Sequence, residues 1–127
     1  MTARILLVED EELNRVLVRA VLARADDPEV RDARLVEAGS LAAARDVLHS
    51  PDPVDVVLLD MNLPDGSGLD LATELAGTDD KPRVIALTAS VLPSDRAAAL
   101  KAGCDGFLDK PYAAADLVSV IASHLPH

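Results

Sequence analysis

Five short apolar runs are spaced along the chain, separated by polar or glycine-containing segments. Each run is rich in Val, Ile and Leu, which is typical of β-strands. The runs are continuous rather than alternating in polarity, which favours a parallel sheet covered by helices on both faces. The predicted strands are residues 4–8, 33–38, 54–59, 83–88 and 106–109.

Between these runs, apolar residues recur at helical spacing, which predicts one helix after each strand. The first helix is expected to present one apolar face, made of Leu13, Val16, Leu17, Ala20 and Val21. The second is expected to begin at an N-cap, Ser40, and to end before Pro51. Three more helices are predicted at residues 68–76, 92–102 and 113–125. Inward-facing residues are predicted to be Leu41, Ala44 and Leu48 in the second helix, and Leu117, Val120, Ile121 and Leu125 in the last.

This alternation of strands and helices predicts an α/β fold with a doubly wound parallel sheet. Right-handed crossovers leave few arrangements, and a five-stranded sheet in the order 2-1-3-4-5, the flavodoxin-like or chemotaxis-regulator-like order, fits the length. The 127 residues are expected to form a single domain, residues 1–127. One segment, residues 24–32, is polar and contains a proline, and it is predicted to be an extended surface loop.

The composition narrows the classes of function. The net charge is −10, which argues against direct binding to nucleic acid or to an anionic membrane. The single cysteine, Cys104, excludes an intramolecular disulfide. No apolar run approaches the ~20 residues that a transmembrane helix needs, and the N-terminus lacks the apolar core of a signal peptide. We therefore expect a cytoplasmic protein.

Carboxylates gather at the predicted ends of two strands. Glu9 and Asp10 follow the first strand, and Asp60 ends the third. In the predicted order these strands are neighbours, and ligands of such sheets bind at the carboxyl ends of the strands. Like charges this close need a proton or a cation, and oxygen ligands suit a hard ion such as Mg²⁺.

Two further residues are expected at the same edge. Thr88 ends the fourth strand, and Lys110 follows the fifth. A metal ion, a hydroxyl and an ammonium group together can stabilise the oxygens of a transferring phosphoryl group. An aspartate can accept that group as an acyl phosphate, so Asp60 is predicted to be a phosphoryl acceptor.

Each of these residues also has an ordinary structural explanation. Acidic pairs are common in solvated loops and at helix N-termini, and Asp60 could simply begin a turn. Thr88 could end a strand, and Lys110 could start a loop. The functional interpretation depends on all of them occurring together at the ends of four strands.

Four segments carry a resemblance to a known family. "ILLVEDEELNR", "VVLLDMNLPDGSGLDL", "VIALTA" and "AGCDGFLDKPY" resemble, in order and spacing, the motifs of the receiver domains of bacterial two-component response regulators. The resemblance covers essentially the whole chain. It implies a Mg²⁺-dependent phosphoacceptor that receives its phosphoryl group from a histidine kinase or a histidine phosphotransfer protein.

The resemblance also implies roles for individual residues. Glu9 and Asp10 would be the acidic pair near the metal, although a Glu at the first position is less common than Asp. Asp60 would be both phosphoacceptor and metal ligand, and the backbone carbonyl of Asn62 would complete the protein ligands. The remaining implied residues are Thr88 as the switch hydroxyl, Ala89 as its small neighbour, Lys110 as the phosphate partner, Pro111 in a cis peptide with Lys110, and Phe107 as the switch aromatic.

The same resemblance predicts how the signal leaves the domain. Phosphorylation would change the surface formed by the fourth helix, the fifth strand and the fifth helix. Because Phe107 has no hydroxyl, its inward state would gain only burial, so we expect that state to be appreciably populated without phosphate. The output would be a contact with a downstream protein, and self-association as a homodimer is left open.

Two other functions share parts of this pattern. One is a Mg²⁺-dependent phosphatase with an aspartate nucleophile, but such enzymes usually carry a second acid two residues later, where this chain has Asn62. The other is a pseudo-receiver that binds partners without phosphate. The favoured function is a signalling phosphoacceptor that catalyses only its own phosphorylation and dephosphorylation and is not a metabolic enzyme.

Overall fold

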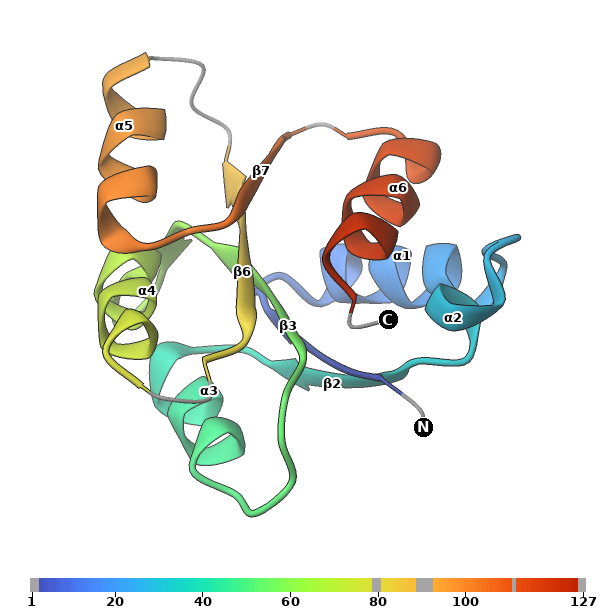
Figure 1. Ribbon diagram of the computed structural model, residues 1–127, viewed down its shortest axis with the longest axis horizontal. Helices are drawn as coiled ribbons and strands as arrows, with labels where there is room; N and C mark the ends of the chain where they lie inside the picture. Colours follow the sequence, from blue (N-terminus) through green and yellow to red (C-terminus); the bar gives the residue numbers. More distant parts are fainter. Residues whose placement is uncertain (1–2, 79–80, 89–92, 111, 126–127) are drawn as a thin grey trace.

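The computed structural model describes residues 3–78, 81–88, 93–110 and 112–125. A five-stranded parallel sheet forms its centre (Figure 1). Its strands are β1 (Arg4–Val8), β2 (Arg34–Ala38), β3 (Val56–Asp60), β6 (Arg83–Thr88) and β7 (Gly106–Asp109). They lie in the order β2-β1-β3-β6-β7, which confirms the predicted order when these five strands are counted along the chain.

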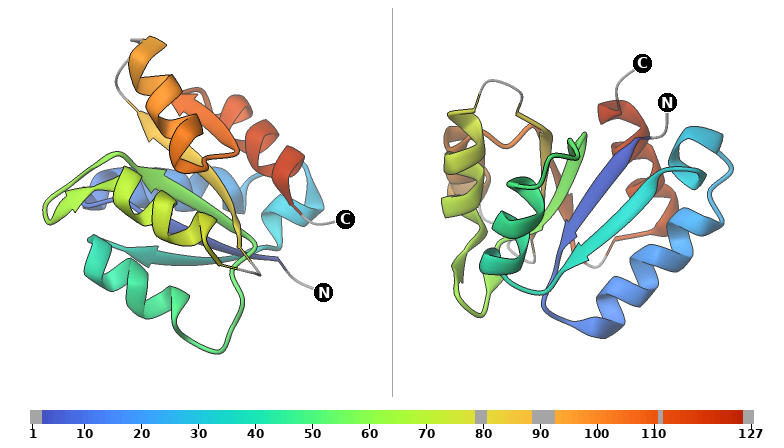
Figure 2. Two further views of the ribbon diagram at one scale, coloured as in Figure 1. Left: turned by 60° about the vertical axis from the view of Figure 1, so that its left-hand side comes forward. Right: turned by 90° about the horizontal axis from the view of Figure 1, so that it is seen from below.

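Helices cover both faces of this sheet. They are α1 (Glu12–Ala23), α2 (Pro28–Arg31), α3 (Leu41–Leu48), α4 (Gly68–Ala76), α5 (Pro93–Ala102) and α6 (Ala114–His124). The first two and α6 lie on one face, and α3, α4 and α5 lie on the other, as Figure 2 shows from below. No described helix is long and apolar enough to span a bilayer.

The central strands contribute to two separate cores because successive side chains of a strand point to opposite faces. Leu6 and Leu59 pack under α3 and α4, whereas Leu7 and Leu58 pack under α1 and α6. All residues of β3 are buried. This double burial explains the continuous apolar runs, and it confirms the interpretation made from them.

The expected surface loop at residues 24–32 is wrong in part. It contains the one-turn helix α2, with Pro28 in the first turn and the Asp27 side chain accepting a hydrogen bond of 2.9 Å from the amide of Glu29. Val30 and Ala25 are buried against the α1–α6 side of the sheet. The segment therefore completes a core, and its Asp-Pro pair is an ordinary helix-start signal.

The predicted apolar face of the first helix is also wrong in part, since among its five residues Val21 packs against the core. The residues of α1 that are fully buried are Val18 and Leu22, whereas Leu13, Val16 and Leu17 are 68%, 41% and 54% exposed. Apolar residues occur on more than half of the helix circumference, so periodicity alone does not identify the side that faces the sheet. Three large apolar side chains of α1 are therefore exposed on its surface.

A small antiparallel pair follows β3 and was not predicted. Its strands are β4 (Asn62–Leu63) and β5 (Gly66–Ser67), with Asn62 opposite Ser67 and Leu63 opposite Gly66. Strands of two residues carry no measurable periodicity, so the sequence pattern could not indicate them. This hairpin matters for the site because it begins directly beyond Asp60 and Met61.

Candidate functional site

Two acidic side chains are buried where β1 and β3 end side by side. Val8 is opposite Leu59 in the parallel register, so Glu9 and Asp60 are next to each other at the carboxyl edge of the sheet. Glu9 is 2% exposed and Asp60 is 6% exposed, whereas Asp10 is exposed. Carboxylate oxygens of these three residues all lie within 4.8 Å of one another, as the strand order predicts.

Lys110 reaches the same cluster from the end of β7. Its backbone amide donates a hydrogen bond of 2.7 Å to the carbonyl of Thr88. Its Nζ lies 3.4 Å from Glu9 Oε1 and 3.4 Å from Asp60 Oδ2. One ammonium thus lies beside two members of a cluster of three carboxylates, which leaves an excess of negative charge at this edge of the sheet.

Glu9 carries the clearest electrostatic perturbation. Burial, together with the neighbouring Asp60 carboxylate, raises the pKa of its carboxyl group from 4.5 to about 7, against the hydrogen bond from Asn14. Its second oxygen, Oε2, is buried and has no hydrogen-bond partner among the described residues. A buried carboxylate oxygen in this position needs a proton or a cation.

The pKa of Lys110 is also raised, but for an amine this shift favours the charged form. Burial alone would lower the pKa of its ammonium group, but the negative charges of Asp60 and Glu9 outweigh burial and raise that pKa. The ammonium therefore stays protonated at neutral pH. It is a fixed positive charge beside the Asp60 carboxylate.

The structure brings Thr88 to the same edge. It is the last residue of β6, the strand next to β3, and it is 8% exposed. The backbone of Asn62 begins β4, two residues beyond Asp60. Ala89 and Pro111 lie outside the described residues, and so does the Lys110–Pro111 peptide bond.

Phe107 lies on β7, opposite Ala86 of β6, and is half-buried against the α3–α5 core. The Arg96 guanidinium of α5 lies 5.8 Å from the centre of its ring, which is within cation–π range. The same guanidinium forms an ion pair with Asp109, which shares a face of β7 with Phe107. The sequence analysis did not identify Arg96 or Asp109. The only sequence feature that pointed to this contact is the position of Asp109, two residues after Phe107.

A groove of about 500 Å³ opens beside the cluster, between α1 and α6. Lys110 and Tyr112 line one side of it, and Asn14 and Leu17 of α1 line another. Its lining is mostly apolar. The carboxylate cluster therefore borders a surface on which apolar groups are accessible.

The arrangement suits one kind of chemistry. A carboxylate that is held beside an ammonium group can act as a nucleophile toward an electrophile that carries its own negative charge. The ammonium and a cation bound by the excess carboxylates would neutralise that charge. A phosphoryl group fits this description.

Comparisons with known proteins agree with this geometry. The family model described as response regulator receiver domain matches residues 5–122. The chain is 36% identical over 119 residues to the two-component response regulator ORR41 of Oryza sativa subsp. japonica, covering 94% of this chain and 91% of that protein. It is 38% identical over 120 residues to the aerobic respiration control sensor protein ArcB of Escherichia coli (strain K12), covering 92% of this chain but only 14% of ArcB.

A solved structure supports the same assignment. The Mn(2+)-bound form of response regulator Rcp1 superimposes with a TM-score of 0.78 at 27% sequence identity. The superposition covers 98% of this chain and 99% of Rcp1. The strand order, the acidic cluster and these matches are in agreement, and the chain belongs to the family of response regulator receiver domains.

Proposed function

We propose that Asp60 is the phosphoacceptor of this receiver domain and that transfer to it depends on Mg²⁺. The observation that supports this most strongly is the position of the Lys110 ammonium, 3.4 Å from both Asp60 and Glu9. Asp60 ends β3, the strand that lies between β1, which the acidic pair follows, and β6, which ends in Thr88. A phosphoryl group on Asp60 would therefore meet positive charge on one side and a metal ion on the other.

The donor set fits Mg²⁺. Carboxylates of Glu9, Asp10 and Asp60 would hold the ion together with the backbone carbonyl of Asn62 and water, an oxygen-only set typical of this cation. Oε2 of Glu9, which has no hydrogen-bond partner in the described part of the chain, supports a cation at this point. When bound, Mg²⁺ would supply charge neutralisation for the phosphoryl oxygens. The similar response regulator Rcp1 has been solved in a Mn(2+)-bound form, which is in keeping with a divalent ion here.

In the transfer step, an oxygen of the Asp60 carboxylate forms a P–O bond while the P–N bond of a donor phosphohistidine breaks. Lys110 holds one phosphoryl oxygen through its ammonium, and the hydroxyl of Thr88 donates to another. Loss of the phosphoryl group to water uses the same residues. Self-catalysed phosphorylation and dephosphorylation are thus both attributed to the residues around Asp60.

The donor is expected to be a histidine kinase or a histidine phosphotransfer protein. Any such partner must reach over the carboxyl edge of the sheet to Asp60. The exposed Leu13 and Leu17 of α1, and the apolar groove lined by Leu17 and Tyr112, lie beside that edge and offer it a contact surface.

Output is proposed to leave through the surface of α5, β7 and α6, toward a downstream protein. Support comes from Arg96, which links α5 to β7 through the ring of Phe107 and the carboxylate of Asp109. A change at Thr88 would reach these residues through the β6–β7 pairing, where Thr88 is opposite Asp109. Self-association, a single functional domain over residues 1–127 and a cytoplasmic location stay predictions.

Intact-mass measurement tests the proposal directly. The chain is incubated with a small acyl phosphate and Mg²⁺, with and without a chelator. We expect one added phosphoryl group that depends on the divalent ion and that maps to a peptide containing Asp60. No observation on the described residues favours the phosphatase or the pseudo-receiver over this function.

A further inference from the structure

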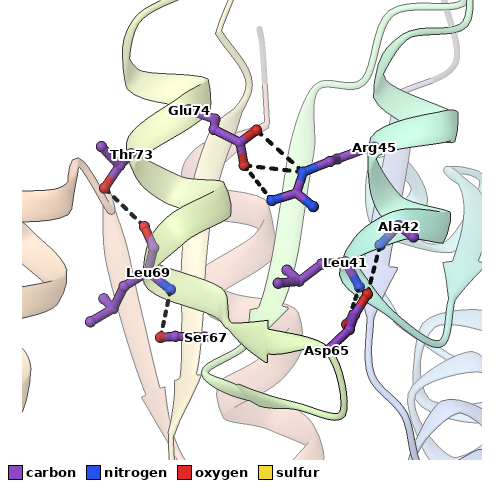
Figure 3. Close-up of polar contacts among 8 residues, drawn as sticks. All are labelled: Leu41, Ala42, Arg45, Asp65, Ser67, Leu69, Thr73 and Glu74. Atoms are coloured by element: carbon purple, nitrogen blue, oxygen red, sulfur yellow. Dashed lines mark hydrogen bonds and ion pairs between the residues drawn. The ribbon is translucent and has the colours of Figure 1, made fainter.

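The segment between Asp60 and α4 is hydrogen-bonded to α3, a helix that precedes it in the chain. The carboxylate of Asp65, at the tip of the β4–β5 hairpin, accepts two backbone hydrogen bonds from the start of α3 (Figure 3). Oδ1 accepts from the amide of Leu41 at 2.9 Å, and Oδ2 accepts from the amide of Ala42 at 3.1 Å. These residues lie 24 and 23 positions before Asp65.

These two bonds complete the cap of α3. A helix leaves its first amide groups without partners inside the helix. The local N-cap, Ser40, accepts from the amide of Ala43 through its hydroxyl at 3.1 Å and from Ala44 through its carbonyl at 3.0 Å. Asp65 accepts hydrogen bonds from the amides of Leu41 and Ala42, so α3 is capped both by its own N-cap residue and by the hairpin.

The hairpin is also held by close packing. A Cβ at Gly66, where φ is +148°, would lie 2.9 Å from Cδ1 of Leu41. A Cβ at Gly68 would lie 2.5 Å from the carbonyl oxygen of Asp60. The hairpin is therefore packed closely against α3, and the residue that follows it, Gly68, is packed closely against Asp60.

The base of the hairpin is tied to the strand edge. The amide of Gly68 donates to the carbonyl of Met61 at 3.1 Å, and the amide of Met61 donates to Leu87 of β6 at 3.3 Å. The Ser67 hydroxyl caps α4 through the amide of Leu69 at 3.2 Å. Because Asn62 is paired with Ser67 at this base, its backbone position depends on both ends of the hairpin.

We propose that Asp65 is a positioning residue for the divalent-cation site, and that it acts by anchoring the hairpin that carries Asn62 to α3. This inference rests on the proposed function, since Asn62 supplies a backbone carbonyl to the ion there. Without the Asp65 carboxylate, the hairpin loses both of its hydrogen bonds to α3, and fewer contacts restrain the strand that begins with Asn62. The carbonyl of Asn62 then has a wider range of positions, and the ion is bound less tightly.

Helices α3 and α4 are also joined by an exposed ion pair. The Arg45 guanidinium of α3 binds the Glu74 carboxylate of α4, with Nη2 at 2.8 Å from Oε2 and Nε at 3.2 Å from Oε1 (Figure 3). This pair lies away from Asp65 on the same two helices, as the figure shows.

The test compares Asp65→Ala with Ser40→Ala, which removes the other side-chain cap of the same helix without touching the hairpin. Mg²⁺ alone is titrated into each chain, and its dissociation constant is measured from backbone amide shifts in NMR spectra. We expect Asp65→Ala to weaken Mg²⁺ binding about 5- to 10-fold, below the ~10- to 100-fold typical of groups bonded directly to a metal ligand. Ser40→Ala should bind Mg²⁺ like the wild-type chain, and both variants should lose a similar amount of stability in urea.

Asp65→Asn provides a rescue, because its single side-chain oxygen can still accept from one of the two amides. Its Mg²⁺ affinity is expected to fall between those of the wild type and Asp65→Ala. If Asp65→Ala does not fold, Asp65→Asn is compared with Ser40→Ala instead. The Leu41 and Ala42 amide resonances should both shift in Asp65→Ala, which verifies that the contact has been lost, and at least one of them should shift in Asp65→Asn.

Two results would overturn the inference. One is unchanged Mg²⁺ affinity in the Asp65 variants while the Leu41 and Ala42 amides have shifted. The other is an equal loss of affinity in Ser40→Ala, since this would attribute the effect to general weakening of α3. The proposed function fails separately, if the wild-type chain binds Mg²⁺ but accepts no phosphoryl group on Asp60.

Discussion

The Lys110 ammonium lies 3.4 Å from a carboxylate oxygen of Asp60, although the two residues are 50 positions apart in the chain. The contact exists because β3 and β7 both end at the carboxyl edge of the sheet, on either side of β6. At this distance in a partly buried site, the attraction is stronger than for an exposed ion pair. Lys110 is therefore suited to neutralise both the carboxylate and a phosphoryl group bound to it.

Replacing Lys110 by alanine should slow phosphoryl transfer while the fold is kept. Removal of one charge-stabilising donor from a site of this kind typically costs about 100-fold or more in rate. The rate is measured by intact mass with a small acyl phosphate, and folding by circular dichroism. Lys101→Ala is the matched control, since Lys101 is exposed on α5, and it should react like the wild type. Equal rates for both variants would show that Lys110 takes no part in transfer.

The stability of the metal-free chain should depend on pH through Glu9. Burial, with the neighbouring Asp60 carboxylate, raises the pKa of this carboxyl from 4.5 to about 7, so the folded chain holds a proton more tightly than the unfolded chain does. The resulting stabilisation is complete below about pH 4.5 and is lost as the pH rises through 7. In urea titrations across this window, the free energy of unfolding should fall more steeply for the wild type than for Glu9→Gln.

Mg²⁺ should act in the opposite direction at the same residue. The ion competes with the proton on Glu9, so it should stabilise the folded chain more at about pH 8 than at about pH 5.5. Glu9→Gln should weaken this effect at the higher pH. If Mg²⁺ stabilises both chains equally at both pH values, Glu9 does not contribute to the cation site.

The link from Arg96 to Phe107 and Asp109 should hold α5 against β7. Arg96→Met keeps most of the aliphatic stem but removes the ion pair and the cation–π contact, at a cost of about 0.5–1 kcal/mol for partly exposed groups. We expect faster hydrogen exchange in α5 and a more mobile Phe107 ring in NMR spectra. Arg83→Met breaks a comparable pair with Asp105 near the other end of β7 and should leave α5 unchanged. Unaltered exchange in Arg96→Met would remove this link from the output pathway.

The strands and the edge at which the site forms could be predicted because both follow from local patterns. Continuous apolar runs identify doubly buried strands, and the residue that follows each run lies at the carboxyl edge whatever the details of packing. Glu9, Asp60 and Lys110 are brought together by this rule alone. The predicted start of β3 is two residues early, yet Asp60 still ends the strand.

Other features could not be predicted because they depend on tertiary contacts. The inward face of α1 is set by how the helix lies on the sheet, and both Val18 and the exposed Leu17 satisfy helical periodicity. The bonds from Asp65 to α3 join residues far apart in the chain, as the Asp65–Leu41 separation of 24 illustrates. No local pattern in the sequence indicates a helix cap that a distant hairpin supplies.

The central claim is that Asp60 accepts the phosphoryl group, and intact mass after acyl-phosphate treatment with Mg²⁺ tests it most directly. The Asp60→Asn side chain keeps nearly the same shape but is not a carboxylate nucleophile. The wild-type chain should gain one phosphoryl group, Asp60→Asn should gain none, and a chelator should prevent the gain in the wild type. Labelling of Asp60→Asn to the wild-type level would contradict the claim and place the acceptor on another residue.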